Sequence, residues 1–294
     1  MGTYYVGRVL KLGVLNQQLL VDAIKSPAAI EIRGSSWTFS DVEDYKYDEK
    51  QFLFGRLIKY HPKGEVSVID TESRSKITQI EPNLVIAESP FVYIPEHSGI
   101  VFLNVYNHIE QTVFTSRFCK VIERTHKDFF VDCKIEMVSD LRTFAVKLLS
   151  LEGIYLIKAK VSPPNPLFGP LWASLKEYLE MRNTDRLTIS EDSPKAEPLK
   201  TDLPTHVQKS AEQDKENPYK PESPLPIGDA AILMAADGYG SGFIKGKKDN
   251  EIVTIKTSET VKNFSYDRAP KPIELFKKAW DIFENIKNNR HMKH

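Results

Sequence analysis

The chain has 294 residues, of which 41% are apolar and 27% charged, and its 40 Lys/Arg balance its 40 Asp/Glu. This composition is typical of a globular protein long enough for two domains, and it excludes general disorder. No apolar run approaches the roughly 18 residues of a membrane-spanning helix and no secretory signal is apparent, so we expect a cytoplasmic protein without membrane contact. Two cysteines, Cys119 and Cys133, are too few for a disulfide framework or a thiolate metal site, and we expect both to be reduced and buried.

The first 105 residues are rich in β-branched and aromatic runs bounded by turn-forming residues, which predicts a mostly antiparallel sheet. A short helix is expected between Val14 and Lys25. The clearest hairpin pairs Phe91–Ile94 with Ile100–Leu103 across a loop that ends in Gly99, where a positive φ is tolerated. The expected strands are Tyr4–Leu10, Ala29–Ile32, Phe52–Tyr60, Val66–Ile69, Leu84–Ala87, Phe91–Ile94 and Ile100–Val105.

Between residues 107 and 190, segments with an apolar period near 3.6 alternate with segments of period two, which predicts alternating helices and strands. This order resembles part of a ferredoxin-like layer, with helices on one face of a sheet. The expected fold class is therefore α+β, with a mixed, mostly antiparallel sheet. The expected elements are a helix capped by Asn107, a strand Phe129–Met137, a helix capped by Ser139 and ended by Gly153, a strand Ile154–Val161, a sheet exit at Pro163–Pro166, a helix over Phe168–Leu179 and an edge strand Leu187–Ser190.

Residues 191–226 contain seven prolines and almost no large apolar side chains, which predicts a solvated polar linker. It divides the chain into a main α+β domain, residues 1–190, and a small unit, residues 227–294. So small a unit is marginal alone, and we expect it to pack on the main domain or on a second copy. Its expected elements are strands Ala230–Ala236, Gly242–Lys245 and Glu251–Thr257, turns at Asp237–Gly240 and Gly246–Asn250, and a helix that begins at Pro272.

Charge is unevenly distributed along the chain. Residues 241–294 hold twelve Lys/Arg against seven Asp/Glu, while the remainder carries the opposite balance. A basic end on an acidic protein predicts a docking surface for a polyanion, and aromatic residues such as Phe243 lie between the cations. A generic charged surface is the alternative. The candidate phosphate contacts are Lys245, Lys247, Lys248, Lys256, Arg268 and Lys271.

A metal-dependent nuclease is a second hypothesis. Asp132-Cys-Lys134 on a predicted strand has the acidic-x-Lys pattern in which a carboxylate holds Mg²⁺ and the lysine steadies the attacking water. Glu88 or Glu110 would have to supply a further ligand. An exposed lysine that alternates with a buried cysteine explains the pattern equally well.

Two other motifs fail on spacing. The glycines around Lys247 suggest a phosphate-binding loop, but Ser241 stands where such a loop needs glycine and Lys248 where it needs Ser or Thr. His108-Ile-Glu110 begins a zinc-deaminase signature, but no Cys-x-x-Cys follows. We therefore expect no cofactor and no metal site.

Three stretches together carry a resemblance: the Phe91–Leu103 hairpin, the run Val161–Asn183 with its Pro163-Pro-Asn-Pro, and Asp237-Gly-Tyr-Gly240 with the strands after it. They resemble an uncharacterised bacterial domain family found near phage-resistance genes. Chain length and the ending of a hairpin followed by a helix are also similar to the lambda exclusion protein RexA. The resemblance implies a homodimeric, non-enzymatic nucleic-acid-binding component, for DNA rather than RNA, of an anti-phage defence system. The alternatives are a nuclease effector and a subunit that binds a partner defence protein.

Overall fold

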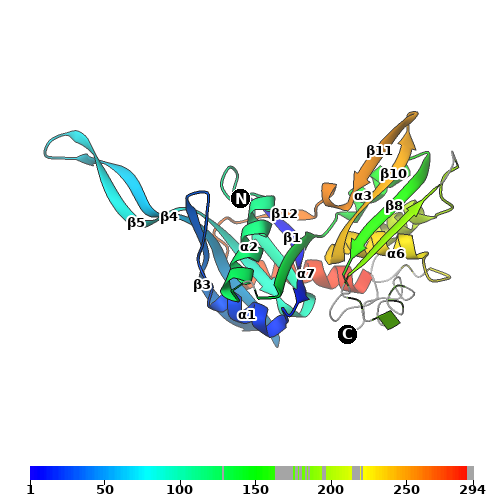
Figure 1. Cartoon of the computed structure of the whole chain (residues 1–294), viewed down its shortest axis with the longest axis horizontal. Coiled ribbons are helices and arrows are strands. Elements are labelled where there is room, and N and C mark those ends of the chain that lie inside the picture. The colour runs from blue at the N-terminus through cyan, green and yellow to red at the C-terminus, as the bar shows by residue number, and fades with distance from the viewer. Residues whose placement is uncertain are drawn as a thin grey trace.

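The computed structural model describes residues 1–127, 129–162, 175, 178, 181–182, 184, 186–193, 197–213, 219 and 221–289. Its strands form two antiparallel sheets with helices packed on both, which confirms the α+β class (Figure 1). The proline-rich exit at Pro163–Pro166 lies outside the described residues, and so does the helix expected over Phe168–Leu179, apart from Leu175 and Tyr178, which are helical. No described helix combines the length and apolar character needed to span a membrane.

The first sheet has the strand order β12-β1-β6-β5-β4-β3-β2, and β7 also pairs with β1. Helices α1 and α2 cover one face, where Phe91, Phe102, Phe114 and Phe118 pack together. Helix α7 crosses the other face, and its Phe276 stacks on Phe52 with ring centroids 4.1 Å apart. The bounds are β1 Gly2–Gly13, β2 Ile30–Ile32, β3 Ser35–Tyr47, β4 Lys50–Asp70, β5 Ser75–Ile94, β6 Gly99–Leu103, β7 Val131–Met137, β12 Asn263–Tyr266, α1 Gln17–Lys25, α2 Gln111–Thr125 and α7 Pro272–Asn289.

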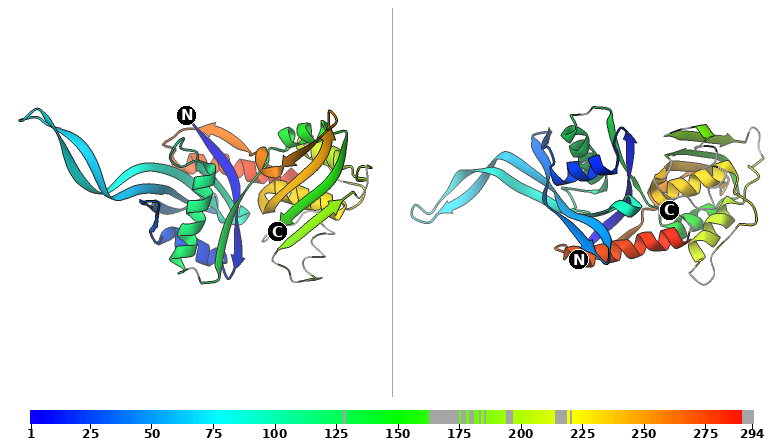
Figure 2. Two further views of the ribbon diagram at one scale, coloured as in Figure 1. Left: turned by 45° about the horizontal axis from the view of Figure 1, so that its top comes forward. Right: turned by 90° about the horizontal axis from the view of Figure 1, so that it is seen from below.

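The second sheet has the order β11-β10-β8-β9, and its helices gather on one side of it (Figure 2). Helix α6 lies against β8, β9 and β10, while α3 packs on α5. The opposite face of the sheet carries no described helix. The bounds are β8 Gly153–Val161, β9 Leu187–Asp192, β10 Gly240–Lys248, β11 Glu251–Lys256, α3 Leu141–Leu149, α5 Leu203–Glu212 and α6 Ile227–Met234.

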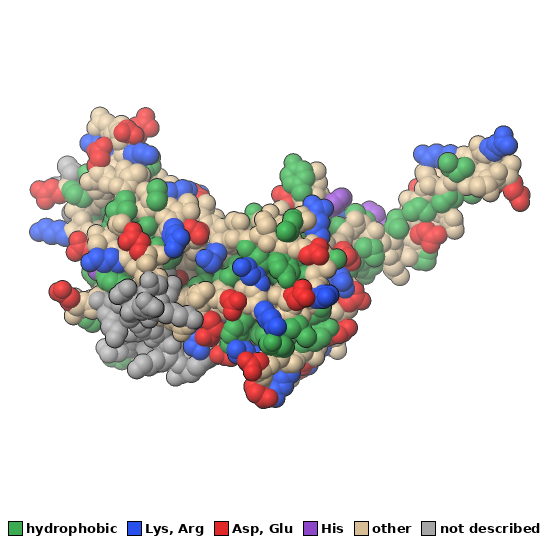
Figure 3. Space-filling model, turned by 180° about the vertical axis from the view of Figure 1, so that it is seen from behind, with side chains coloured by type: hydrophobic (Ala, Val, Ile, Leu, Met, Phe, Trp, Pro, Cys, Tyr) green, Lys and Arg blue, Asp and Glu red, His purple; other side chains and the backbone are tan. Residues whose placement is uncertain are grey.

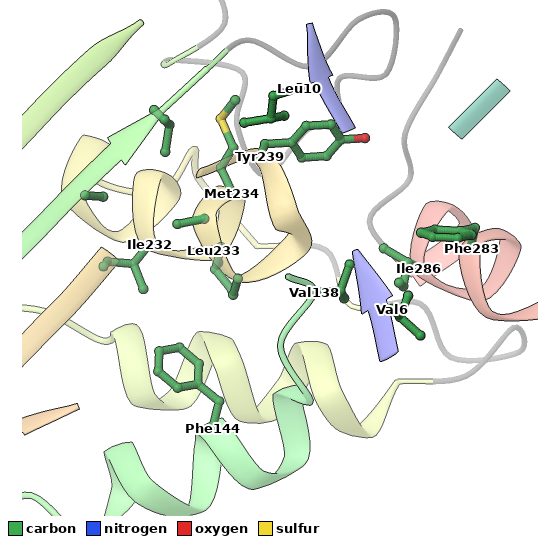
Figure 4. Packing of buried hydrophobic residues seen from close by; sticks show 14 of the residues in the cluster. Val6, Leu10, Val138, Phe144, Ile232, Leu233, Met234, Tyr239, Phe283 and Ile286 are labelled. Atoms are coloured by element: carbon green, nitrogen blue, oxygen red, sulfur yellow. The ribbon is translucent and has the colours of Figure 1, made fainter. Parts of the chain in front are cut away.

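One apolar cluster extends from the first sheet to the second. The cluster includes Leu233 of α6, Val6 of β1, Val138 after β7 and Ile286 of α7, and Figure 4 shows Val6, Val138 and Ile286 close together. Arg8 of β1 is completely buried beside this cluster. Its guanidinium donates to the backbone oxygens of Asp237 and His97, at 2.8 and 2.5 Å, and lies over the rings of Tyr239 and Phe283. The C-terminal residues therefore pack on the N-terminal ones, as a marginal small unit requires.

Strands β4 and β5 continue far beyond the first sheet as a two-stranded arm, residues 61–84 (Figures 1 and 2). The last β3 pairing with β4 is Ser36 with Tyr60, so the outer edge of β4 is open from there on. The sequence predicted separate short strands here, because each apolar run is bounded by turn-forming residues. Pro62 and Pro82 lie within the arm. Proline is tolerated at such positions because an open edge needs no ladder donor.

Residues 230–236 form helix α6 and its continuation rather than the predicted strand. A wholly apolar run lacks the periodicity that distinguishes the two structures. The turn predicted over Gly246–Asn250 is shorter than expected, since only Asp249 and Asn250 connect β10 to β11. Their φ angles of 50° and 68° are the positive values that a two-residue hairpin loop requires.

Helix α1 and the pairing of Phe91 with Phe102 are confirmed, but in the loop of that hairpin Ser98 rather than Gly99 has the positive φ, 46°.

Several helix ends differ from the predicted ones by one or more residues. Glu110, not Asn107, is the residue before α2, and Asp140, not Ser139, caps α3. Gly153 begins β8 instead of ending that helix.

The segment predicted as a solvated linker is packed in the part that the structure describes. Helix α5 lies within it and buries Leu203 and Val207 completely. The predicted single ferredoxin-like layer is also divided, because β7 joins the first sheet and β8 the second. Cys119 and Cys133 are buried and form no disulfide, as expected.

Candidate nucleic-acid interface

Four lysines gather on the face of the second sheet that carries no described helix. They are Lys158 and Lys160 of β8, Lys245 of β10 and Lys256 of β11, all exposed, and we call them the basic face. Successive side chains of a strand point to opposite faces, so these lysines alternate with side chains directed at the helices. The inward set is apolar and consists of Ile157, Ala159, Val161, Ile244 and Ile255.

The strand register places an aromatic ring in the middle of the basic face. Phe243 of β10 is directly opposite Lys256 on one side and Lys158 on the other. Cross-strand neighbours of this kind have Cβ atoms about 5 Å apart, so a partly exposed ring lies between two amines. A shallow depression of about 210 Å³ is lined by this group together with Lys160, Thr188, Ser241 and Ser258.

Within the described part of the chain, the positive charge of the basic face is only partly offset, because Lys160 also lines a cleft with Asp132 and Glu136. None of its four lysines makes an ion pair with a described residue. On the outward side of the four strands the acidic residue is Asp192, at the end of edge strand β9 and opposite Leu156. Lys247 also points outward, but it lies 3.9 Å from Glu152. Exposed amines of this kind can neutralise phosphates.

Glycines on the inward side of β10 allow the sheet and its helices to approach closely. A Cβ on Gly242 would lie 2.7 Å from Cδ1 of Ile232 on α6 and 3.1 Å from the Lys158 backbone oxygen. Gly242 also exchanges hydrogen bonds with the Thr257 hydroxyl. The glycine-rich sequence that resembled a phosphate loop therefore serves the packing of this sheet.

The six cations predicted from the C-terminal charge do not form one surface. Lys245 and Lys256 belong to the basic face, and Lys247 lies beside it. Lys248 lies at the end of the β10–β11 hairpin, and strand alternation directs its side chain to the face opposite the basic face. Arg268 and Lys271 follow β12 at the first sheet, where Arg268 donates to the backbone oxygen of Met1 and Lys271 lies 3.7 Å from Glu274.

Sequence reasoning missed Lys158 and Lys160, which supply half of the basic face. The signal was present, since both alternate with apolar residues in the strand predicted over Ile154–Val161. What the sequence did not show is that this strand pairs with β10, about eighty residues further along the chain.

The residues of the nuclease hypothesis lie between the two sheets, next to the Lys160 end of the basic face. Asp132 is 2.9 Å from Arg186, and Lys134 pairs with Glu136. They line a cleft of about 140 Å³ with Lys160. Glu88 and Glu110 are elsewhere: Glu88 lies 3.8 Å from Arg56, and Glu110 accepts from the backbone nitrogen of Asn107. Neither therefore supplies the further ligand that this hypothesis requires.

Among the described residues, one group of three His, Cys, Asp or Glu side chains is close enough to share an ion: Glu96, His97 and Glu284. The Lys287 amine lies 3.4 Å from a carboxylate oxygen of each glutamate, and His97 Nε2 lies 3.4 Å from Glu284. The lysine offsets one of the two carboxylate charges at the junction of the β5–β6 turn with α7, so this arrangement joins elements of the fold.

Comparison with known proteins gives a family but no activity. A family model described as a domain of unknown function, DUF4747, matches residues 17–287, which is most of the chain and includes the second sheet and every strand of the first sheet except β1. No curated protein matches the sequence.

Proposed function

The chain belongs to the DUF4747 family, a domain of unknown function, and we propose from the geometry of its basic face that it binds nucleic acid without cutting it. The observation that supports this proposal is the convergence of Lys158, Lys160, Lys245 and Lys256 on one open sheet surface. The strand ladder, rather than a mobile loop, fixes the backbone positions of these lysines, so their side chains emerge on one surface.

Electrostatics gives the proposal a quantitative form. Each lysine that neutralises a phosphate releases a condensed counterion, and the logarithm of affinity then falls linearly with the logarithm of salt concentration. Four contacts predict a slope of about −3 to −4. A surface that only happens to be positive would show a shallower dependence.

Fluorescence anisotropy with labelled oligonucleotides at several salt concentrations tests the proposal. Replacing Lys158, Lys160, Lys245 and Lys256 by Ala should weaken binding at least tenfold and reduce the salt slope by about one per phosphate contact removed. The matched control replaces four exposed lysines elsewhere, Lys46, Lys120, Lys200 and Lys278, and changes net charge equally. Equal binding by wild type and both variants would overturn the proposal.

The biological setting is part of the same proposal. The sequence resemblance supports a homodimeric DNA-binding component of an anti-phage system, acting in the bacterial cytoplasm. Plating efficiency of phages on cells that express the wild-type chain, the basic-face variant or its lysine control tests this role. Protection by the wild type and the control, but not by the basic-face variant, is the expected result.

A further inference from the structure

The aromatic ring at the centre of the basic face has a chemistry that phosphate contact alone does not use. Phe243 points outward from a central strand, on the side opposite α6, and keeps part of its ring exposed. A lysine stands directly across from it on each neighbouring strand. Phosphate neutralisation needs the two amines but not the ring between them.

We infer that the basic face selects single-stranded over double-stranded nucleic acid by stacking an unpaired base on Phe243. The inference rests on the proposed function and deepens it by naming the substrate class. Every nucleobase has an apolar π-face, and stacking on an aromatic side chain is largely independent of base sequence.

The spacing of the site suits one nucleotide. Neighbouring strands are about 4.8 Å apart, so the backbones of Lys158 and Lys256 stand about 10 Å apart with Phe243 midway between them. A base laid on the ring would leave its flanking phosphates within reach of the two flexible amines. The lysines then hold the backbone while the ring holds the base.

The surroundings of the ring provide polar partners for the edge of such a base. The depression beside Phe243 is bordered by the hydroxyl-bearing side chains of Thr188, Ser241 and Ser258. Hydroxyl groups donate or accept, so they can serve different base edges. This fits recognition of a base in general rather than of one sequence.

A duplex cannot use the same geometry. Its bases stack on one another inside the helix, and their faces are not available to a ring on a flat sheet. A duplex could still place phosphates against the lysines, but Phe243 would then face the sugar-phosphate backbone. The difference between the two substrates is therefore the stacking contribution.

Competition binding with one oligonucleotide sequence, single-stranded or in a duplex, tests the inference on the full-length protein. We expect the wild type to prefer the single strand by about 5- to 100-fold. Phe243→Leu should lose most of this preference while its duplex affinity and salt slope stay unchanged, and Phe243→Tyr should retain it. DNA and RNA versions run in parallel show which backbone is preferred.

A second measurement uses the wild-type protein alone and so does not depend on a variant that folds. A single strand carrying 5-iodouracil is irradiated in the complex, and the cross-linked peptide is identified by mass spectrometry. Cross-linking at Phe243 is expected. Salt-dependent binding with cross-links elsewhere, or an unchanged single-strand preference in Phe243→Leu, would overturn stacking but leave the proposed function standing. Absence of any binding by the wild type would overturn both.

Discussion

Lys11 is a largely buried lysine whose positive charge destabilises the folded state. Its amine donates to Ser98 Oγ at 2.6 Å and Gln17 Oε1 at 3.2 Å, and both acceptors are neutral. Burial lowers the pKa of Lys11 from 10.5 to about 8. Between these two pH values the unfolded chain binds more protons than the folded chain, so the free energy of unfolding rises with pH. Below pH 8 the buried Lys11 amine is charged in the folded state, and this lowers the free energy of unfolding by at most about 3 kcal/mol.

The variant Lys11→Met tests this cost, because it keeps the length of the side chain and removes the titrating group. The free energy of unfolding is measured by denaturant titration at pH 7.5, 9 and 10.5. From the lowest to the highest pH, the free energy of unfolding of the wild type should rise by about 2–3 kcal/mol more than that of Lys11→Met. A difference that is independent of pH would mean that Lys11 is solvated in the folded state.

Sequence reasoning at the residue scale found part of the candidate site. The charge imbalance of the chain end indicated Lys245 and Lys256, because a local count detects a local excess. Lys158 and Lys160 escaped it, since their region is not basic overall and joins β10 only through sheet topology. The same count also selected Arg268 and Lys271, which follow β12 at the first sheet and lie outside the basic face.

At the scale of the element, Gly242 is the point where β10 meets α6. Gly242→Ala would place a methyl group 2.7 Å from Cδ1 of Ile232 and 3.1 Å from the Lys158 backbone oxygen. The Ile232 side chain must rotate within the core, or the sheet and the helix must shift by a few tenths of an ångström, at a cost of about 1–3 kcal/mol. Thermal and denaturant unfolding should show this loss, whereas Ser241→Ala on the outward face should change stability by less than about 0.5 kcal/mol. Equal stability of both variants would contradict the close packing.

Elements with a clear period were predictable from the sequence, and those without one were not. The strand over β8 and the helix α7 follow from alternation and from a stripe after Pro272, respectively. Helix α6 was missed because residues 230–236 are all apolar and show no period, so only contact with the sheet decides their structure. Caps such as Asp140 compete with adjacent Ser139, whose hydroxyl instead donates to the Thr257 backbone oxygen.

On the scale of the whole molecule, the arm of residues 61–84 stands apart from a body in which the two sheets share one cluster (Figure 3). It carries three Lys/Arg and four Asp/Glu, so its charge does not suit a polyanion. Ile69 near its tip and Ile80 midway along it are 75% and 66% exposed, and Val85 at its base is 55% exposed. A lone two-stranded ribbon is only marginally stable in water, and its open edges favour pairing with another chain.

These features connect the arm with the homodimer that the resemblance implies, and we predict that the arm contributes to the dimer contact. The test replaces residues 65–80 with Asn-Gly, which joins Gly64 to Glu81, two residues that already face each other in the ladder. Light scattering after size-exclusion chromatography should give twice 33.6 kDa for the wild type and the monomer mass for the trimmed chain. Because the arm adds little to the core, the trimmed body should unfold with a similar free energy. The double variant Ile69→Glu with Ile80→Glu keeps the length of the arm but replaces two exposed apolar side chains with charged ones, and it should also give a monomer. A dimer that survives both changes would place the contact on the body instead.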